Sequence, residues 1–451
     1  MSATQSGPSR APGHLPRVGP ANETVASEIR SSRVQLISRR WKRATWFAVV
    51  TYCLGSPSLI PVLHILPAGS TSRGLCLTAI PLIGAVALGP RIEPERSRAV
   101  DKTVVLLVLV LALQAVSAVA NLGLSYLVHA APAVALLILG MAARANIRDL
   151  PSVQIRTCLR GPIGPLIALL LLSWCAQLTH LVPSIYPSSF VISISGSRLQ
   201  GLAIHPDGFG LLAALVAVLS FCAASSRLIW VARAISFLSI LGTDSRTAFL
   251  AMAAGVLLFW VFGPEWPLSR RVSAILSAIF ATPLAWIYID IHRATGSGQG
   301  DILTGRALIW ADASHLVHQV GLLGDGPETI ARLFPALLGA YTHIYQAQNQ
   351  WINDAVNFGY LESALLAVLL LSFLVTGERT YRHTLLIPLV GFILIESFSE
   401  IPIDFWASTV EAFPFFLLLL LCPRRCDPRP LDSLPRVTLE PVHTEVSRIV
   451  I

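Results

Sequence analysis

Three arginines lie in polar segments that separate long apolar runs of the sequence, and their neighbours suit an anionic ligand. Arg198 lies in the segment 195–201, which is rich in Ser and Gly, and Arg246 lies in the segment 242–248, directly ahead of an apolar run. Arg306 follows a glycine in a third, longer polar segment. A guanidinium is a planar fork that matches phosphate oxygens, and glycine and serine allow a ligand close to the backbone. These arginines are therefore candidate ligands for a phosphate-bearing group.

Other polar residues beside the first two arginines give each segment a second interpretation. His205 could accept a proton, but a histidine ahead of proline more commonly starts a helix. Asp244 or Ser245 is a plausible N-cap, and a helix N-terminus adds its own attraction for an anion. The alternative to ligand binding is that the arginines pair with an acid such as Asp244 or Asp301, or extend along the membrane surface. Because the arginines recur in similar segments, we favour ligand binding.

The segment 346–362 is the second place where chemistry could occur, because it ends the longest polar interruption of the sequence. Gln348 and Asn349 can orient a hydroxyl group through their amides, whereas His343 and Asp354 are nearby side chains that could take a proton. Tryptophan and tyrosine in the same interruption suit a surface that lies on lipid headgroups or stacks on sugar rings. We therefore expect this segment to hold an acceptor molecule.

The elements that position these segments are expected to be membrane helices. The chain has 451 residues, of which 54% are hydrophobic and 13% charged, whereas a soluble domain carries about 25% charged residues. A helix needs about 20 apolar residues to cross a bilayer, and the chain offers about a dozen such runs. We predict an all-α polytopic membrane protein with about 12 transmembrane helices. The predicted spans are 45–66, 74–90, 103–121, 124–143, 162–183, 206–224, 228–242, 247–263, 272–290, 357–376, 384–399 and 407–422.

The distribution of basic residues predicts how the spans are oriented. Arginine and lysine gather before the first predicted span and after the even-numbered spans. By the positive-inside rule this side is cytoplasmic, and both termini lie there. The predicted organisation is a disordered cytoplasmic tail over 1–43, a membrane domain over 44–422 and a cytoplasmic tail over 423–451. A large extracytoplasmic loop over 291–356, between the ninth and tenth spans, carries the acceptor segment on the same side as the candidate arginines.

Composition excludes several other classes of site. The seven cysteines mostly lie within apolar runs, and no close pair is joined by a second pair or by a histidine cluster. The sequence therefore predicts no metal site, no disulfide framework and no cofactor. The net charge of +8 follows the predicted loop topology, so it does not indicate binding of nucleic acid.

Taken in order, these motifs resemble the O-antigen ligase and polymerase superfamily of bacterial envelope glycan transferases. The order comprises an arginine and a glycine ahead of His-Pro, a Ser-Arg pair heading a helix, Gly-Arg with a downstream tryptophan, a Gly-x-Gly, and a polar pair ahead of a glycine in a span. The resemblance covers roughly residues 195–376 by motif and the whole chain by topology. It implies a C-type, metal-independent, inverting glycosyltransferase that takes a glycan from a polyprenyl diphosphate carrier. Arg198 and Arg246 would hold the diphosphate, with Arg306 as a third candidate.

One position departs from the ligase pattern. Ligase members carry a histidine, taken as the base that activates the acceptor hydroxyl, where this chain has Gln348, followed by Asn349 and, further on, by Gly359. Glutamine cannot accept a proton at neutral pH. Three interpretations follow, in order of preference: a polymerase-like member that dispenses with the base, a member whose base is His343 or Asp354, or a homologue that binds a glycan-lipid without transferring it.

The function that the resemblance implies is a polysaccharide polymerase or ligase of the bacterial cell membrane, with polymerase preferred. Its partners would be the lipid bilayer, a polyprenyl-diphosphate-linked glycan and an acceptor glycan or lipid. A flippase or transporter for a lipid-linked glycan is the main alternative, but its polar residues would lie near the midplane of the membrane, and the sequence shows no evident internal repeat. A non-enzymatic scaffold would leave the outer arginines unexplained.

Overall fold

All regular elements that the computed structural model describes are helices, which confirms the all-α prediction for this part of the chain. The described residues are 20–55, 71–88, 102–146, 154–181, 197–203, 205–263, 267, 269, 306–327, 329–330, 332–333, 349–375, 382–398 and 413–421. The elements are α1 (Pro20–Gly55), α2 (Thr71–Leu88), α3 (Lys102–Leu122), the 3-10 helix η2 (Leu124–Ala130), α4 (Ala131–Asn146), α5 (Ile155–Cys158), α6 (Arg160–Leu178), α7 (Pro206–Cys222), α8 (Arg227–Thr243), α9 (Arg246–Phe262), α11 (Arg306–Val317), α13 (Gln350–Phe358), α14 (Tyr360–Val375), the π-helix η4 (Arg382–Leu386), α16 (Ile387–Ser397) and α17 (Phe413–Leu421).

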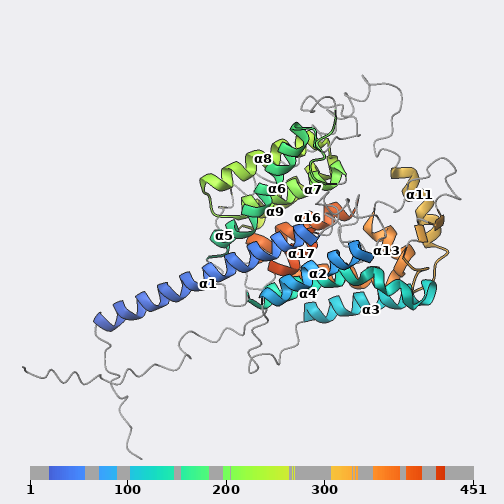
Figure 1. Cartoon of the computed structure of the whole chain (residues 1–451), viewed down its shortest axis with the longest axis horizontal. Coiled ribbons are helices and arrows are strands. Elements are labelled where there is room, and N and C mark those ends of the chain that lie inside the picture. Colours follow the sequence, from blue (N-terminus) through green and yellow to red (C-terminus); the bar gives the residue numbers. More distant parts are fainter. Residues whose placement is uncertain are drawn as a thin grey trace, which may run out of the picture.

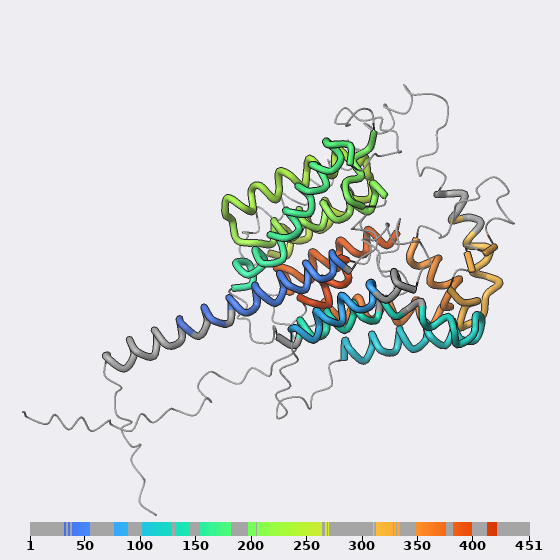
Figure 2. Tube along the Cα trace, in the orientation of Figure 1, coloured from blue at the N-terminus to red at the C-terminus, as the bar shows by residue number. Residues whose placement is uncertain are grey.

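The helices form a layered bundle. α6, α7, α8 and α9 make one layer, α2, α3 and α4 lie on the opposite side, and α11 and α13 lie across one end (Figure 1). The helices closest to the C-terminus, drawn from orange to red, lie between these two groups (Figure 2). Consistent with this order, α16 packs on α9 and α17 packs on α4. Segments far apart in the sequence thus form one packed core.

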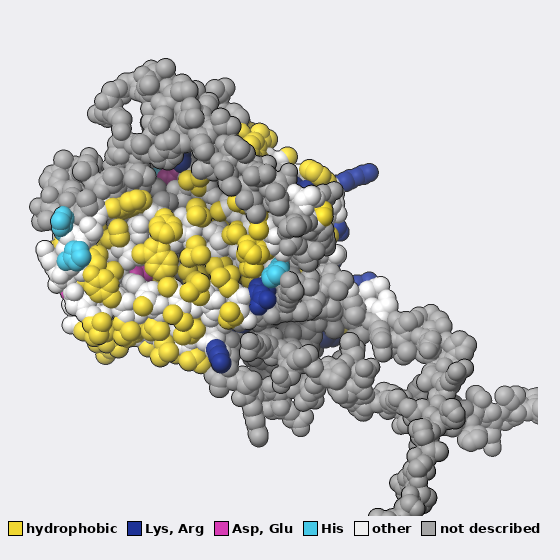
Figure 3. Space-filling view, turned by 180° about the vertical axis from the view of Figure 1, so that it is seen from behind, with side chains coloured by type: hydrophobic (Ala, Val, Ile, Leu, Met, Phe, Trp, Pro, Cys, Tyr) yellow, Lys and Arg dark blue, Asp and Glu magenta, His cyan; other side chains and the backbone are white. Residues whose placement is uncertain are grey.

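Two kinds of helix surface distinguish the interior of the bundle from its outside. α7 is buried on all sides, from Pro206 to Cys222 with little interruption, as expected of a helix that is apolar all round. α8 instead leaves a row of large apolar side chains exposed, including Trp230 and Phe237. Figure 3 shows a broad hydrophobic face of the molecule, with Lys and Arg side chains at its edge. Exposed apolar faces this extensive are suited to lipid and not to water.

The length of the helices only partly tests the predicted topology. By length and composition, two of the described helices can cross a membrane, Lys102–Leu122 and Ile155–Leu178. Five further apolar helices are shorter, between 10 and 17 residues. The expected number of spans and the boundaries of the membrane domain therefore stay predictions, and the predicted span 272–290, about half of the loop 291–356 and the tail 423–451 lie outside the described residues.

Two predicted segments differ from the structure. The helix α1 begins at Pro20, so residues 20–43, expected to be part of a disordered tail, are helical. The physical reason is that proline suits the first position of a helix and that neither proline nor glycine recurs before Gly55. The predicted span 124–143 is divided into η2 and α4, because Pro132 lacks a backbone donor and so starts a new helix.

Two hydrogen bonds show that α3 and α14 run antiparallel. At one end Ser372 Oγ lies 3.5 Å from Thr103 Oγ1. At the other end Ser117 Oγ donates to the carbonyl of Asn357, just ahead of α14, at 2.9 Å. The start of α14 and the end of α3 therefore lie at the same end of the bundle.

The remaining helices can be assigned to the same end. The side-chain amide of Asn349, ahead of α13, donates to the carbonyl of Phe398 after α16 at 3.1 Å. At the opposite end of the bundle, His383, which precedes α16, packs against Phe262 at the end of α9, with ring centroids 6.1 Å apart. Because α9 and α16 pack along one another, the start of α9 lies with the end of α16. We name the end that gathers the starts of α9, α13 and α14 the site end.

Candidate functional site

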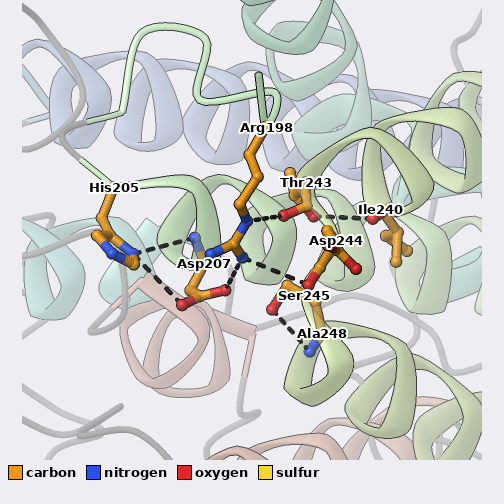
Figure 4. Close-up of polar contacts among 8 residues, drawn as sticks. All are labelled: Arg198, His205, Asp207, Ile240, Thr243, Asp244, Ser245 and Ala248. Atoms are coloured by element: carbon orange, nitrogen blue, oxygen red, sulfur yellow. Dashed lines mark hydrogen bonds and ion pairs between the residues drawn. The ribbon is translucent and has the colours of Figure 1, made fainter. Parts of the chain in front are cut away.

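Arg198 lies where three helices meet at the site end. It belongs to the non-helical segment 197–203 between α6 and α7. Its Nε donates to the carbonyl of Thr243 at 2.6 Å, and its Nη2 donates to Asp207 Oδ1 at 2.5 Å and to the carbonyl of Asp244 at 3.4 Å (Figure 4). The guanidinium therefore ties the last turn of α8 to the first turn of α7.

The charges around Arg198 suit the helix ends that carry them. Asp207 lies in the first turn of α7, where the helix dipole stabilises a carboxylate, and the carbonyls of Thr243 and Asp244 end α8, where the dipole stabilises a cation. The side chains of Arg198 and Asp207 are each 18% exposed, so the pair is reachable from one side only. Arg198 thus pairs with a nearby acid, as the alternative interpretation expected, although Asp207 is not one of the acids it named. Asp301 lies outside the described residues.

His205 caps the start of α7. Its Nδ1 accepts a hydrogen bond from the backbone N–H of Asp207 at 3.2 Å and lies 3.4 Å from Asp207 Oδ2. A ring nitrogen that accepts this bond must be unprotonated, so the neutral ring carries its proton on Nε2. This contact favours the helix-start role of His205 over the role of proton acceptor.

The turn between α8 and α9 carries the second candidate arginine. Asp244 ends α8 in a left-handed conformation (φ 53°, ψ 33°), and Ser245 caps α9 by accepting from the N–H of Ala248 at 3.4 Å. Of the two predicted caps for α9, Ser245 is correct and Asp244 instead closes the preceding helix. Arg246 follows as the first residue of α9, and its side chain is exposed. Arg198 therefore donates to the two carbonyls that precede Ser245, and Arg246 follows that serine in the chain.

Gly210 allows α7 to lie directly against this turn. A Cβ atom at this position would lie 2.7 Å from Thr243 Oγ1, 3.0 Å from Ser245 Cβ and 3.2 Å from Ala248 Cβ. Those distances are too short for a larger residue without movement of the turn. The absence of a side chain at Gly210 thus helps to set the distance between Asp207, one turn earlier, and the arginines.

The other candidate residues around the long polar segment are only partly described. Arg306 is the first residue of α11, so it too begins a helix, but its side chain is outside the described part of the structure. His343 and Gln348 also lie outside the described residues. Their roles stay predictions.

Asn349 and Asp354 are described, and both form internal contacts. Asn349 caps α13: its Oδ1 accepts from the N–H groups of Trp351 and Ile352, at 3.1 and 3.2 Å. Asp354 is 1% exposed, and its Oδ2 accepts from Gln350 Nε2 at 2.6 Å. These contacts are typical of structural roles, because each of them lies within α13 or at its N-cap and stabilises that helix.

The Gly-rich segment 321–326 is bound to the end of α13. Asp325 N–H donates to the carbonyl of Val356 at 3.1 Å, and Gly326 N–H donates to the carbonyl of Asn357 at 2.9 Å. Gly324 and Gly326 both have positive φ, 67° and 92°. The glycines therefore allow a close backbone contact, so this Gly-x-Gly shapes the acceptor region and does not by itself form a phosphate-binding loop.

Of a buried polar pair beside this region, Glu362 was singled out as the last residue of the candidate segment 346–362, whereas its partner Gln114 was not. Gln114 of α3 donates through Nε2 to Glu362 Oε1 of α14 at 2.7 Å, and both side chains are almost fully buried. The available signal was a single glutamine inside the apolar run 103–121. A polar side chain in such a run needs a buried partner, which is how the pair could have been anticipated.

One segment of the chain, which includes several of these helices, matches a known protein family. Residues 231–367 match the sequence model of the O-antigen ligase family. The matched segment contains most of α8 together with α9, α11 and α13, hence Arg246, Arg306 and the acceptor region, whereas Arg198 lies ahead of it. No curated protein matches the chain. The match supports a role in polysaccharide ligation or polymerisation at a membrane, and residues 231–367 are similar to the O-antigen ligase family.

Proposed function

We propose that the protein transfers a glycan from a polyprenyl diphosphate carrier to an acceptor at the outer face of the bacterial cell membrane. The observation that carries this proposal is the junction of Arg198 and Arg246 across the turn between α8 and α9. Arg198 donates to the carbonyls of Thr243 and Asp244, and Arg246 follows two residues later at the start of α9. Paired arginines at a helix start match the two phosphates of such a donor.

The charge balance at this junction explains how an anion would be held. The formal charges of Arg198 and Arg246 are matched by those of Asp207 and Asp244, so the arginines alone leave no surplus. The N-termini of α7 and α9 each add a partial positive charge of about half a unit, which the C-terminus of α8 offsets only in part. A third cation is needed for a diphosphate, and Arg306 at the start of α11 is the candidate that remains.

The proposed reaction is an inverting displacement at the anomeric carbon. The acceptor oxygen forms a bond to that carbon while the bond to the diphosphate oxygen breaks, and the polyprenyl diphosphate leaves with the electron pair. Arginines and helix N-termini stabilise the negative charge that develops on the leaving phosphate, so the chemistry needs no metal. The acceptor proton passes to His343 if that residue is the base, and otherwise to solvent water or to the departing phosphate, whereas Asp354 is paired with Gln350.

The polymerase-like interpretation is therefore still preferred, with His343 as the remaining candidate for a dedicated base. The acceptor would lie at the start of α13, which Asn349 fixes to the end of α16. The extracytoplasmic position of this site follows from the distribution of basic residues. Lys102, Arg156 and Arg382 lie at the end of the bundle away from the site end, and the positive-inside rule assigns basic ends to the cytoplasm.

The test is glycan transfer in lipid nanodiscs, from a polyprenyl-diphosphate-linked glycan to an acceptor glycan. The protein would be compared with its Arg198→Ala, Arg246→Ala and Gln348→His variants, each shown to be folded by its thermal unfolding. We expect both arginine variants to lose transfer and donor affinity. Full transfer and donor binding by both would refute the diphosphate site, and donor binding without product from the unaltered protein would identify a homologue that binds a glycan-lipid without transferring it.

A further inference from the structure

Gln177, in the last turn of α6, forms several hydrogen bonds with the main chain of the segment that carries Arg198. Its side chain is 3% exposed. Nε2 donates to the carbonyl of Arg198 at 3.0 Å, while Oε1 accepts from the N–H groups of Gln200 and Gly201 at 2.8 and 3.0 Å. One amide thus contacts the backbone on both sides of Leu199.

This segment depends on neighbouring helices for its hydrogen bonds. Residues 197–203 are not helical, so their backbone groups have no partners of the kind that a helix supplies. Besides Gln177, the described partners from neighbouring helices are the carbonyl of Gly242, which accepts from Leu199 N–H at 2.7 Å, and Ser173 Oγ, which accepts from Leu202 N–H at 3.2 Å. Gln177 therefore makes more of the described hydrogen bonds to the main chain of the segment 197–203 than either Gly242 or Ser173, and one of them is to the carbonyl of Arg198.

We infer that Gln177 is a positioning residue for Arg198, an inference that rests on the proposed function. The side chain of Arg198 is fixed by Thr243 and Asp207, and its main chain is fixed by Gln177, so the direction of the guanidinium is set from both ends. Glutamine is suited to this role because its amide holds a donor and an acceptor at one place. A side chain with only one of these functions leaves a buried backbone group without a partner, which costs more than the bond itself contributes.

Two variants separate the hydrogen bonds from packing. Gln177→Met keeps the length of the side chain and removes all three bonds. Gln177→Glu keeps the two acceptor contacts and replaces the donor to Arg198 with an oxygen. The matched control is Thr179→Val at the same end of α6, because Thr179 is exposed and its hydroxyl donates only to carbonyls of its own helix, those of Cys175 and Ala176.

The decisive readout is a double-mutant cycle on glycan transfer. We expect Gln177→Met and Gln177→Glu to lower kcat/KM by about tenfold or more in the otherwise unaltered protein, since each loses at least one buried hydrogen bond. In the Arg198→Ala background the same changes should have little further effect, because their action passes through Arg198. Thr179→Val should stay within about twofold in both backgrounds.

Hydrogen exchange of the amides of Gln200 and Gly201 gives a readout that does not depend on activity. We expect faster exchange in Gln177→Met than in Thr179→Val. Unchanged exchange and transfer in Gln177→Met, or an equal loss of transfer with and without Arg198, would overturn the inference. Failure of the proposed function looks different: Arg198→Ala and Arg246→Ala would then transfer like the unaltered protein, while faster exchange in Gln177→Met would still show that Gln177 holds the segment.

Discussion

The starts of α8 and α9 are almost identical locally and differ in what surrounds them. Each begins with a serine cap followed by an exposed arginine, Ser226-Arg227 in α8 and Ser245-Arg246 in α9. In each, the serine Oγ accepts from the N–H three residues later, at 3.4 Å. A Ser-Arg pair at a helix start is therefore not in itself a sign of a ligand.

The surroundings distinguish the two helix starts. Near Ser226 the carbonyls at the end of α7 accept from arginines: Arg160 Nη2 donates to Ala224 and Ser225, at 3.3 and 2.9 Å, and Arg156 Nε donates to Cys222 at 3.3 Å. Cations belong at a helix C-terminus, so these arginines are accounted for by the fold. Near Ser245, Arg198 likewise donates to the carbonyls that end α8, but it also pairs with Asp207 in the first turn of α7 and so lies beside a helix N-terminus as well.

What distinguishes Arg198 is therefore its additional carboxylate partner at the start of α7, and not its contacts with carbonyls, which Arg160 and Arg156 share. Arg198 is held there by one carboxylate and two carbonyls, and it shares the site with Arg246. That arrangement keeps positive charge where helix dipoles are also positive, which suits an incoming anion.

The largest expected difference is between Arg246→Ala and Arg227→Ala. Loss of Arg246 should lower the rate of glycan transfer by about 100-fold or more, the effect of removing one group that stabilises transition-state charge. Loss of Arg227, the first residue of α8, should leave transfer within about twofold. Initial rates in nanodiscs measure both, and equal effects would show that the two helix starts are equivalent.

The next comparison is Arg198→Lys with Arg160→Lys, because each arginine bonds to two backbone carbonyls. A lysine is a point charge and cannot reproduce the guanidinium fork. We expect Arg198→Lys to lower kcat/KM by about tenfold and Arg160→Lys to lower only the thermal stability. Transfer rates and unfolding temperatures measured together decide this, and a loss of activity confined to Arg160→Lys would contradict the assignment.

A glycine pair tests the packing of α7 on the turn. Gly210→Ala should destabilise the protein by about 1–3 kcal/mol, because its Cβ would meet Thr243 and Ser245. Gly164→Ala in α6 meets nothing within 4 Å. That control should be neutral or stabilising by up to about 1 kcal/mol. Thermal unfolding gives both values. Changes of the same sign and size would show that α7 does not need a glycine at position 210 to lie against the turn.

The smallest effect is expected from the caps themselves. Ser226→Ala and Ser245→Ala should each lower stability by about 1 kcal/mol, since each removes one capping hydrogen bond. Only Ser245→Ala should also slow transfer, by a few-fold, because its cap orients Arg246. The unfolding temperature and the rate of transfer are measured for both variants. An equal change in transfer for the two would show that the cap of α9 does not orient Arg246.

Much of this organisation could be predicted from local sequence. Apolar runs gave α7, α8 and α9 to within a few residues, because burial in a bundle or a membrane needs long apolar helices. The candidate arginines were found because charge interrupts these runs. The partner of Arg198 was not found: Asp207 is nine residues away in sequence, and only the packing of α7 against the turn after α8 brings the two together.

The acceptor region shows the same limit. Asn349 and Asp354 stood out as polar residues, but a polar side chain in a sequence does not show whether it faces a substrate or a helix end. Here Asn349 caps α13 and Asp354 pairs with Gln350. Gln177 was not singled out for a related reason, since its partners are backbone groups of a distant segment and leave no trace in side-chain types.

The central claim is that the turn between α8 and α9 binds a diphosphate and the turn between α7 and α8 does not. Its most direct test is binding of a short-chain polyprenyl diphosphate to the protein in nanodiscs, measured for the unaltered chain and for the Arg246→Ala and Arg227→Ala variants. We predict that Arg246→Ala weakens binding by about tenfold or more, equivalent to about 1.4 kcal/mol, and that Arg227→Ala binds like the unaltered chain. Equal affinities of all three proteins, or a loss confined to Arg227→Ala, would contradict the claim.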